Sequence, residues 1–202
     1  MPAKTRTANE ARVEEILRAA QVVFTERGYS GATTDEIARA ARASKTTLYA
    51  QFGNKQALFR TLLARRLAPA DTAAFRLDAD QPLETMIYRL MLGIVQGATS
   101  PDAVALGRIA LAEAARFPEL KEIMAQRMRY TELAAYLRGC RRKGQMAFKD
   151  AEATASMLVA MAQSDWTARA LYGLLDGVSA AQLEAHAAMA TGMFLAAVRP
   201  SA

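Results

Sequence analysis

The chain has 202 residues, of which 52% are hydrophobic and 23% charged, a composition typical of folded globular proteins and not of disordered ones. No apolar run reaches the roughly 18 residues of a membrane span, and acidic side chains such as Glu10 and Glu14 stand where a secretory signal would be apolar. The single cysteine, Cys140, excludes an internal disulfide and a thiolate zinc site. We therefore expect a cytoplasmic protein with no membrane partner.

The charge is concentrated in the first third of the chain. Residues 1–66 contain 12 Lys and Arg against 6 Asp and Glu, whereas residues 67–202 contain 14 of each. The whole net charge of +6 thus belongs to the first segment. This asymmetry predicts a polyanion-binding head on a neutral body. A basic arm kept for solubility is the alternative.

The periodicity of the sequence is helical throughout. Runs of β-branched residues with a period of two are absent, and prolines and glycines divide the chain into pieces of helix length. The sequence predicts an all-α fold of about nine helices, near residues 10–27, 34–41, 44–52, 55–67, 82–98, 101–116, 119–143, 150–173 and 179–198. The first helix has an apolar stripe from Val13 to Phe24, and Gly28 is its stop.

Two short helices follow the first. Thr33 and Glu36 have the spacing of a capping box at the start of one, and Ser44 is an N-cap for the other. Because only a tight turn separates them, residues 33–52 predict a helix-turn-helix. In that motif the second helix enters the major groove of DNA with its N-terminal residues first.

The second short helix has an outward face suited to DNA. Leu48 and Phe52 lie one turn apart and face the core, so Lys45 and Tyr49 point outward. Lysine supplies charge, and threonine and tyrosine hydroxyls bind bases or phosphates. The residues expected to contact DNA are Thr33, Thr34, Arg42, Ser44, Lys45, Thr46, Thr47, Tyr49 and Lys55.

The stretch from Ile16 to Phe59, ILRAAQVVFTERGYSGATTDEIARAARASKTTLYAQFGNKQALF, resembles the DNA-binding domain of the tetracycline-repressor (TetR) family of bacterial transcription regulators. Its specific parts are F-x-E-R-G-Y, T-x-x-E-I-A, S-K-x-T-L-Y and F-x-N-K-x-A-L-F. The resemblance implies a homodimer with a DNA-binding domain at residues 1–54 and an effector-binding and dimerisation domain at residues 55–202. It also implies a repressor of transcription, without enzymatic activity or cofactor, that a small effector releases from double-stranded DNA. A two-fold dimer requires a near-palindromic operator.

The sequence departs from the family pattern at the turn and on the recognition helix. The family's turn usually reads Ala-Gly-Val-Ser, and here it is Ala41-Arg42-Ala43-Ser44. An arginine at the glycine position is strained if the backbone there is left-handed, and it gains a phosphate contact in return. Thr46 and the pair Ala50-Gln51 also differ from common family residues. These changes touch the base-reading face, so the operator sequence is not inherited from relatives.

The C-terminal two thirds is rich in adaptable apolar side chains. All ten methionines except Met1 lie beyond residue 85, in a segment without net charge. This composition favours a pocket for an uncharged, lipophilic effector, with ordinary core filling as the alternative. The expected ligand-binding residues are Met86, Leu90, Phe117, Met124, Met128, Tyr130 and Trp166.

The last two predicted helices carry many small residues between large apolar ones. Small side chains permit close helix approach, and a four-helix seam from two chains would bury the apolar surface. The residues expected at this seam are Met157, Met161, Ala190, Met193 and Phe194. The alternative is a C-terminal helix that packs only on its own core.

The remaining reactive residues carry less information. Cys140 lies among cations in R-G-C-R-R-K. These cations would lower the pKa of the thiol if Cys140 is a redox sensor. The alternative is that they form a solvated basic helix end. His186 has no second metal ligand at suitable spacing, and no G-x-S-x-G, phosphate loop, dinucleotide fingerprint or H-E-x-x-H is present. An enzyme is therefore not expected. An activator of the same family and a helical protein that coats DNA without sequence preference stay open as alternatives.

Overall fold

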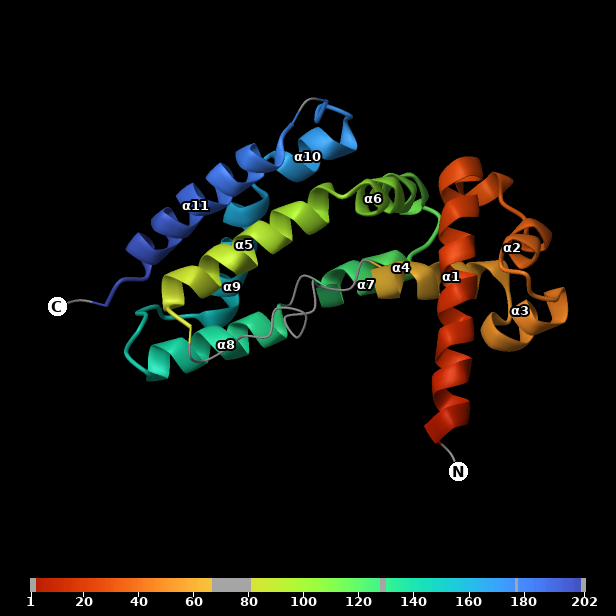
Figure 1. The fold of residues 1–202 in the computed structure, drawn as a ribbon, viewed down its shortest axis with the longest axis horizontal. Coiled ribbons are helices and arrows are strands. Elements are labelled where there is room, and N and C mark those ends of the chain that lie inside the picture. Colours follow the sequence, from red (N-terminus) through yellow and green to blue (C-terminus); the bar gives the residue numbers. More distant parts are fainter. Residues whose placement is uncertain (1–2, 67–80, 128–129, 177, 201–202) are drawn as a thin grey trace. The chain divides into compact units, whose positions relative to one another are not determined.

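The computed structural model describes residues 3–66, 81–127, 130–176 and 178–200, and these residues form eleven helices and no strand (Figure 1). The expected all-α fold is confirmed. The chain divides into two compact units, Met1–Arg66 with Ala105–Ile123, and Leu67–Val104 with Met124–Ala202. None of the described helices has both the length and the apolar character that crossing a membrane requires.

The first unit is built around four N-terminal helices. They are α1 (Ala3–Gly31), α2 (Thr34–Ala40), α3 (Lys45–Phe52) and α4 (Lys55–Arg66). α2 packs against α1, and α3 packs against α2 and α4 (Figure 1). The helical backbone of α1 is interrupted at Gly28, whose φ of 67° is a left-handed value that favours glycine. The sequence places the end of the first helix at this residue.

The core of the first unit contains the apolar stripe that the sequence predicts for the first helix, together with apolar side chains of α4. Ile16, Leu17 and Phe24 of α1 are completely buried, as are Leu58 and Leu62 of α4. Each such side chain stabilises the folded state by about 1.5–3 kcal/mol relative to an exposed position. An ion pair between Glu14 and Arg66 joins α1 to the last residue of α4. These contacts fix the scaffold on which the two short helices rest.

Parts of two later helices belong to this same unit. They come from α6 (Pro101–Glu113) and α7 (Glu119–Arg127). Between these helices, the ring of Phe117 lies 4.6 Å from that of Tyr29 and 5.8 Å from that of Phe59, measured between centroids. Phe24 completes this aromatic cluster, with its ring centroid 5.0 Å from that of Phe59. The middle of the chain therefore packs on the N-terminal helices.

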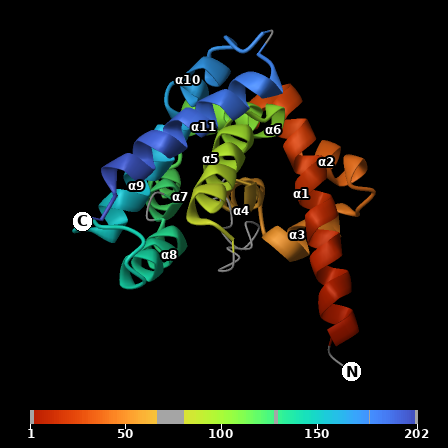
Figure 2. The same ribbon diagram turned by 60° about the vertical axis from the view of Figure 1, so that its left-hand side comes forward.

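The second unit contains α5 (Leu83–Thr99), α8 (Thr131–Arg142), α9 (Ala151–Gln163), α10 (Trp166–Leu171) and α11 (Ala180–Ala197). α5 packs against both α9 and α11, and Figure 2 shows α11 running beside α5. Apolar side chains from these helices form one core that includes Ile87, Leu137, Leu158 and Phe194.

Two of the predicted long helices are each divided in the structure. The run predicted at 119–143 ends at Arg127 and resumes at Thr131, after Tyr130, which has a left-handed φ of 46°. The run predicted at 150–173 is divided at Ser164, whose φ is 43° and ψ −130°. Neither break has the glycine or proline that usually marks one in a sequence, so the described residues form eleven helices where the sequence predicts about nine.

Candidate DNA-binding site

Both short helices begin at the caps that the sequence predicts. The backbone N–H of Glu36 donates to the Thr33 hydroxyl (3.2 Å), and the N–H of Thr33 donates to the Glu36 carboxylate (3.0 Å). The Thr33 hydroxyl also donates to the Glu36 carboxylate (2.9 Å), and this bond together with that from the Thr33 N–H lowers the pKa of Glu36. The N–H of Thr47 donates to Ser44 Oγ (3.0 Å) and starts α3. The hydroxyls of Thr33 and Ser44 therefore set where the two helices begin.

The turn between the helices is a Schellman motif with an arginine in the left-handed position. The N–H of Ala43 donates to the carbonyl of Ala38 (2.8 Å), and the N–H of Arg42 donates to that of Arg39 (3.1 Å). Arg42 has a φ of 49°. Glycine is usual at this position because any other residue costs about 1–2 kcal/mol there. The strain that the sequence indicates at Arg42 is therefore present.

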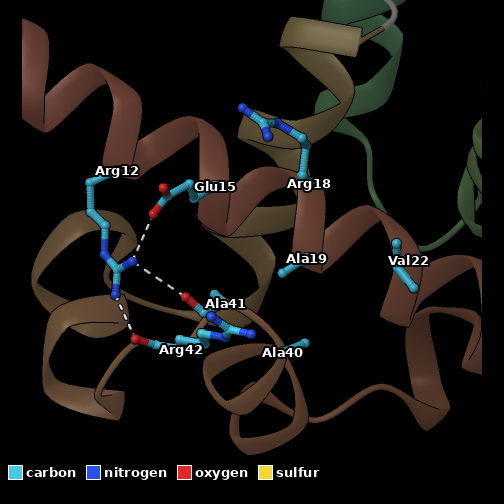
Figure 3. Close-up of a pocket in the computed structure, with 8 residues that line it drawn as sticks. All are labelled: Arg12, Glu15, Arg18, Ala19, Val22, Ala40, Ala41 and Arg42. Atoms are coloured by element: carbon cyan, nitrogen blue, oxygen red, sulfur yellow. Dashed lines mark hydrogen bonds and ion pairs between the residues drawn. The ribbon is translucent and has the colours of Figure 1, made fainter.

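A side chain of α1 holds this turn from outside. Arg12 donates from Nη2 to the carbonyl oxygen of Arg42 (2.8 Å) and from Nη1 to that of Ala41 (3.3 Å). Glu15 Oε2 lies 2.8 Å from Arg12 Nη1 and orients the guanidinium (Figure 3). Sequence reasoning missed this contact of Arg12 with the turn, since nothing local relates positions thirty residues apart.

A groove of about 540 Å³ runs along the turn (Figure 3). Its lining combines three arginines and one carboxylate with small apolar side chains: Arg12, Glu15, Arg18, Ala19, Val22, Ala40, Ala41 and Arg42. In Figure 3 the Arg12 guanidinium points at the turn, and Arg18 extends away from it. The surface beside the turn is thus cationic, as phosphate contact requires.

The outward face of α3 carries the side chains predicted to meet DNA. Lys45, Thr46 and Tyr49 are exposed, whereas Leu48 is completely buried. The hydroxyls of Tyr49 and Thr34 lie 3.2 Å apart, so the start of α2 and the middle of α3 form one surface. Thr47 is half-buried, and its hydroxyl lies 2.7 Å from Ser44 Oγ.

The last predicted DNA contact, Lys55, is held within its own unit. Its Nζ lies 4.5 Å from the centroid of the Tyr29 ring and 3.4 Å from the carbonyl oxygen of Ser30. Asn54 caps the same helix, since its Oδ1 accepts from the N–H of Ala57 at 2.8 Å. A phosphate at this helix start would compete with the Tyr29 ring for the Lys55 charge.

Sequence reasoning also missed a carboxylate on this surface. Asp35 Oδ1 lies 2.7 Å from Lys45 Nζ, and this contact raises the pKa of Lys45. A pair between separate helices leaves no pattern in a sequence. The only local hint is that Asp35 stands in the first turn of α2. An acidic residue there is explained equally well by its favourable interaction with the helix dipole.

The residues expected to bind an effector are spread over both units. Leu90 lies in the core of the second unit, and Tyr130 packs against that core. Met86 and Trp166 are buried and Met124 is half-buried, while Met128 lies outside the described residues. Phe117 belongs to the first unit, where it lines a small cavity of about 10 Å³ with Phe59 and Leu120. Their roles in binding stay predictions.

The residues expected at a dimer seam differ in exposure. Met157 of α9 and Met193 of α11 are 61% and 60% exposed. Ala190 and Phe194 are buried in the core of the second unit, and Met161 is half-buried against it. Met189 of α11 is also 60% exposed. Exposed methionines are therefore present on two helices that pack against each other.

Cys140 and His186 both lie within the packed helices of the second unit. Cys140 is buried, and this burial raises the pKa of its thiol, opposite to the direction that its cationic neighbours in the sequence suggest. His186 Nε2 lies 3.1 Å and 3.0 Å from the carbonyl oxygens of Met161 and Ala162, in the last turn of α9. No group of three or more potential metal ligands occurs among the described residues.

Two capped short helices at a tight turn, with a cationic and hydroxyl-bearing outer face, define the class of helix-turn-helix DNA-binding proteins. Comparison with known families makes the assignment specific. Residues 16–62 match the model for bacterial regulatory proteins of the tetR family, and residues 86–200 match the C-terminal domain of AefR-like transcriptional repressors. The chain belongs to the TetR family of transcriptional regulators. The resemblance drawn from the sequence is confirmed.

Curated relatives share parts of the chain. It is 40% identical over 67 residues to an HTH-type transcriptional repressor of Streptomyces coelicolor and 34% identical over 89 residues to the regulator YhgD of Bacillus subtilis. These matches span 33% and 45% of the relatives' lengths. The repressor BepR of Brucella suis is 28% identical over 157 residues, which cover 73% of this chain and 75% of BepR.

Solved structures confirm the fold over nearly the whole chain. A TetR-family transcriptional regulator from Mesorhizobium loti superposes with a TM-score of 0.82 at 24% identity, covering 93% of this chain and 96% of that one. The flavonoid-responsive regulator FrrA superposes with a TM-score of 0.70 at 26% identity, covering 96% of this chain and all of FrrA.

Proposed function

We propose that this protein is a homodimeric transcriptional repressor that binds a near-palindromic operator in double-stranded DNA and is released by a small, lipophilic effector. The observation that carries the proposal is the surface shared by α2 and α3. There an exposed lysine, threonine and tyrosine of α3 lie beside the capped start of α2, with a groove of arginines at the turn.

The two kinds of DNA contact are divided between different parts of this surface. Lys45 and Thr46 stand in the first turn of α3, the part of a recognition helix that reaches base edges. Arg42 at the turn and Lys55 at the start of α4 flank that helix. They fit phosphates, which position the protein without reading sequence.

The assembly as a homodimer is supported by exposed apolar surface. Met157, Met189 and Met193 are each at least 60% exposed, on helices that pack together in the second unit. Large exposed apolar side chains gathered on one part of a protein commonly mark an interface. A two-fold seam formed by α9 and α11 of both subunits would bury them.

The character of the effector follows from the composition of the second unit and from one relative. Residues 67–202 carry no net charge, and their methionines suit an adaptable apolar pocket. FrrA, 26% identical, is named as a flavonoid-responsive regulator, and flavonoids are aromatic polyphenols. An uncharged aromatic molecule is accordingly the first class to test. Activation of transcription is the less favoured alternative, since BepR and the relative from Streptomyces are both repressors by name.

Selection of bound duplexes from a random DNA pool tests the proposal. We expect a near-palindrome whose half-sites lie about 34–36 Å apart or a multiple of that distance. Binding to the selected site should exceed binding to random DNA by at least about a thousandfold. A pool without enrichment would instead support the protein that coats DNA without sequence preference.

A further inference from the structure

The first turns of the two short helices are joined by an ion pair. Asp35 is the second residue of α2 and Lys45 the first of α3, and Asp35 Oδ1 lies 2.7 Å from Lys45 Nζ. The two side chains are 58% and 53% exposed. Solvent-exposed partners exchange readily, so a base or a phosphate can reach both groups.

This pair lies on the surface proposed to contact DNA. Thr34, the neighbour of Asp35, meets Tyr49 of the recognition helix at 3.2 Å. The adjacent carboxylate, Glu36, accepts from Thr33 and is committed to the cap of its own helix. Asp35 therefore places a negative charge beside Lys45, on a surface where the other proposed contacts are cations and hydroxyls.

The pair retains unused hydrogen-bonding capacity. One lysine proton and one carboxylate oxygen are engaged, which leaves two N–H donors on Lys45 and the second oxygen of Asp35. In the major groove a G·C pair presents the O6 and N7 acceptors of guanine beside the N4 amino donor of cytosine. A donor and an acceptor held side by side are complementary to that arrangement. They are not complementary to phosphate, which is an anionic acceptor only.

We propose that Asp35 is a specificity-determining residue of the DNA-binding surface, which accepts a hydrogen bond from cytosine N4 while Lys45 donates to the paired guanine. This inference rests on the proposed function as a sequence-specific regulator. On non-operator DNA the Asp35 carboxylate repels the backbone and keeps Lys45 from the phosphates. Specificity at this position thus combines an attractive contact with the right base pair and a repulsive one elsewhere.

The DNA affinities of wild type and of one variant test this role. Binding of wild type and Asp35→Ala is measured for the selected operator, for the same operator with each G·C pair replaced in turn, and for random DNA. In wild type, replacing one particular G·C pair of each half-site should weaken binding by roughly tenfold or more. In Asp35→Ala that preference should collapse, while random DNA binds several-fold more tightly.

A charge-matched control separates the local contact from the gain of one positive charge. Glu26 of α1 is exposed and forms no ion pair with any described residue. Glu26→Ala changes the net charge equally, so it should leave every base preference intact. Asp35→Asn keeps the shape and an acceptor oxygen but not the charge. It should bind random DNA as tightly as Asp35→Ala while keeping part of the preference for the G·C position.

The outcomes are distinguishable from failure of the proposed function. If wild type selects no sequence, the assignment as a specific regulator fails. If wild type selects an operator and both Asp35 variants keep its full base preferences, the role of Asp35 is wrong. Equal tightening on random DNA by Glu26→Ala and Asp35→Ala would likewise overturn it, because general charge alone would then explain the gain.

Discussion

The guanidinium of Arg12 in α1 donates a hydrogen bond of 2.8 Å to the carbonyl oxygen of Arg42, the strained residue of the helix-turn-helix. A second bond reaches the carbonyl of Ala41, so one side chain holds two consecutive peptide groups (Figure 3). The supporting helix thereby fixes the angle at which α3 leaves the turn. The arginine that replaces the usual glycine is stabilised by contacts that a local sequence pattern does not contain.

Replacing Arg12 with alanine is expected to weaken both folding and DNA binding. Loss of its two charge-assisted bonds should lower the free energy of unfolding by about 1–2 kcal/mol. The turn would then position α3 less well, and operator affinity should fall more than affinity for random DNA. Thermal unfolding and titration of both DNAs measure the two effects. Arg18→Ala, in the same groove, is the control for the effect on stability. If Arg12→Ala were as stable as wild type, the stabilising role of the Arg12 hydrogen bonds to the turn would be contradicted.

A pair of substitutions separates phosphate contacts from base contacts. Lys55→Ala should weaken binding to all sequences alike and reduce the slope of log K against log salt by about one unit. Thr46→Ala should alter preference at one base position and leave the slope unchanged. Arg60→Ala removes an exposed cation of the same helix as Lys55 and serves as control. Unchanged binding in both test variants at moderate salt would place the recognition face elsewhere.

Stability distinguishes the two roles that the structure gives Lys55. Its ammonium lies over the Tyr29 ring, a contact worth about 0.5–1 kcal/mol at an accessible site. Lys55→Ala should therefore unfold at a slightly lower denaturant concentration than Arg60→Ala. Lys55→Arg keeps both the charge and the stacking, so it should restore stability and the salt slope together. A slope restored without stability would separate phosphate binding from the aromatic contact.

The dimer seam is tested best at a side chain that the single chain exposes. Met193 is 60% exposed, so Met193→Glu should leave each subunit folded and split the dimer in sedimentation. A charge at Ala190 is a poorer test, because this residue is 3% exposed and the substitution would disrupt the core itself. Leu174→Glu, at a similarly exposed apolar residue outside α9 and α11, is the control. A Met193→Glu variant that stays dimeric contradicts the placement.

The parts of the molecule that sequence predicted well are those determined by local rules. Thr33 and Ser44 cap the helices that they precede, because a cap is a contact over three residues. The apolar stripe of α1 lies in the core, because its residues recur with the helical period and share one face of the helix. What sequence did not supply are contacts between distant segments: Arg12 with the turn, and Phe117 with the aromatic cluster.

The helix breaks at Tyr130 and Ser164 escaped prediction for a related reason. Both residues adopt positive φ values without being glycine, and no local sequence pattern marks such a conformation at a tyrosine or a serine. The boundary proposed between residues 54 and 55, the effector-binding residues and the dimer residues stay predictions. The effector-binding residues and the dimer residues depend on a ligand or a second subunit that a single chain does not contain.

Trp166 offers a local probe of effector binding. It is the only tryptophan of the chain and is buried, with the Arg169 guanidinium carbon 4.9 Å from its ring centroid and the His186 ring centroid at 5.9 Å. An uncharged aromatic compound that enters the second unit should quench or shift its fluorescence. The same compound should release operator DNA. A hundredfold loss of DNA affinity requires close to 3 kcal/mol of coupling, within the usual range for allostery.

The experiment follows Trp166 emission and operator binding in parallel across a panel of flavonoids, acyl compounds and aromatic drugs, with charged metabolites as the comparison set. Because a ligand shifts two states only by its differential affinity for them, compounds that perturb Trp166 without releasing DNA bind both states equally. The same compound should still release the Trp166→Phe variant from DNA, although the change in tryptophan emission is lost. This result would show that the emission change reports effector binding and that the Trp166 side chain is not required for release. If a charged metabolite releases DNA while every lipophilic compound leaves both readouts unchanged, the expected effector class is wrong.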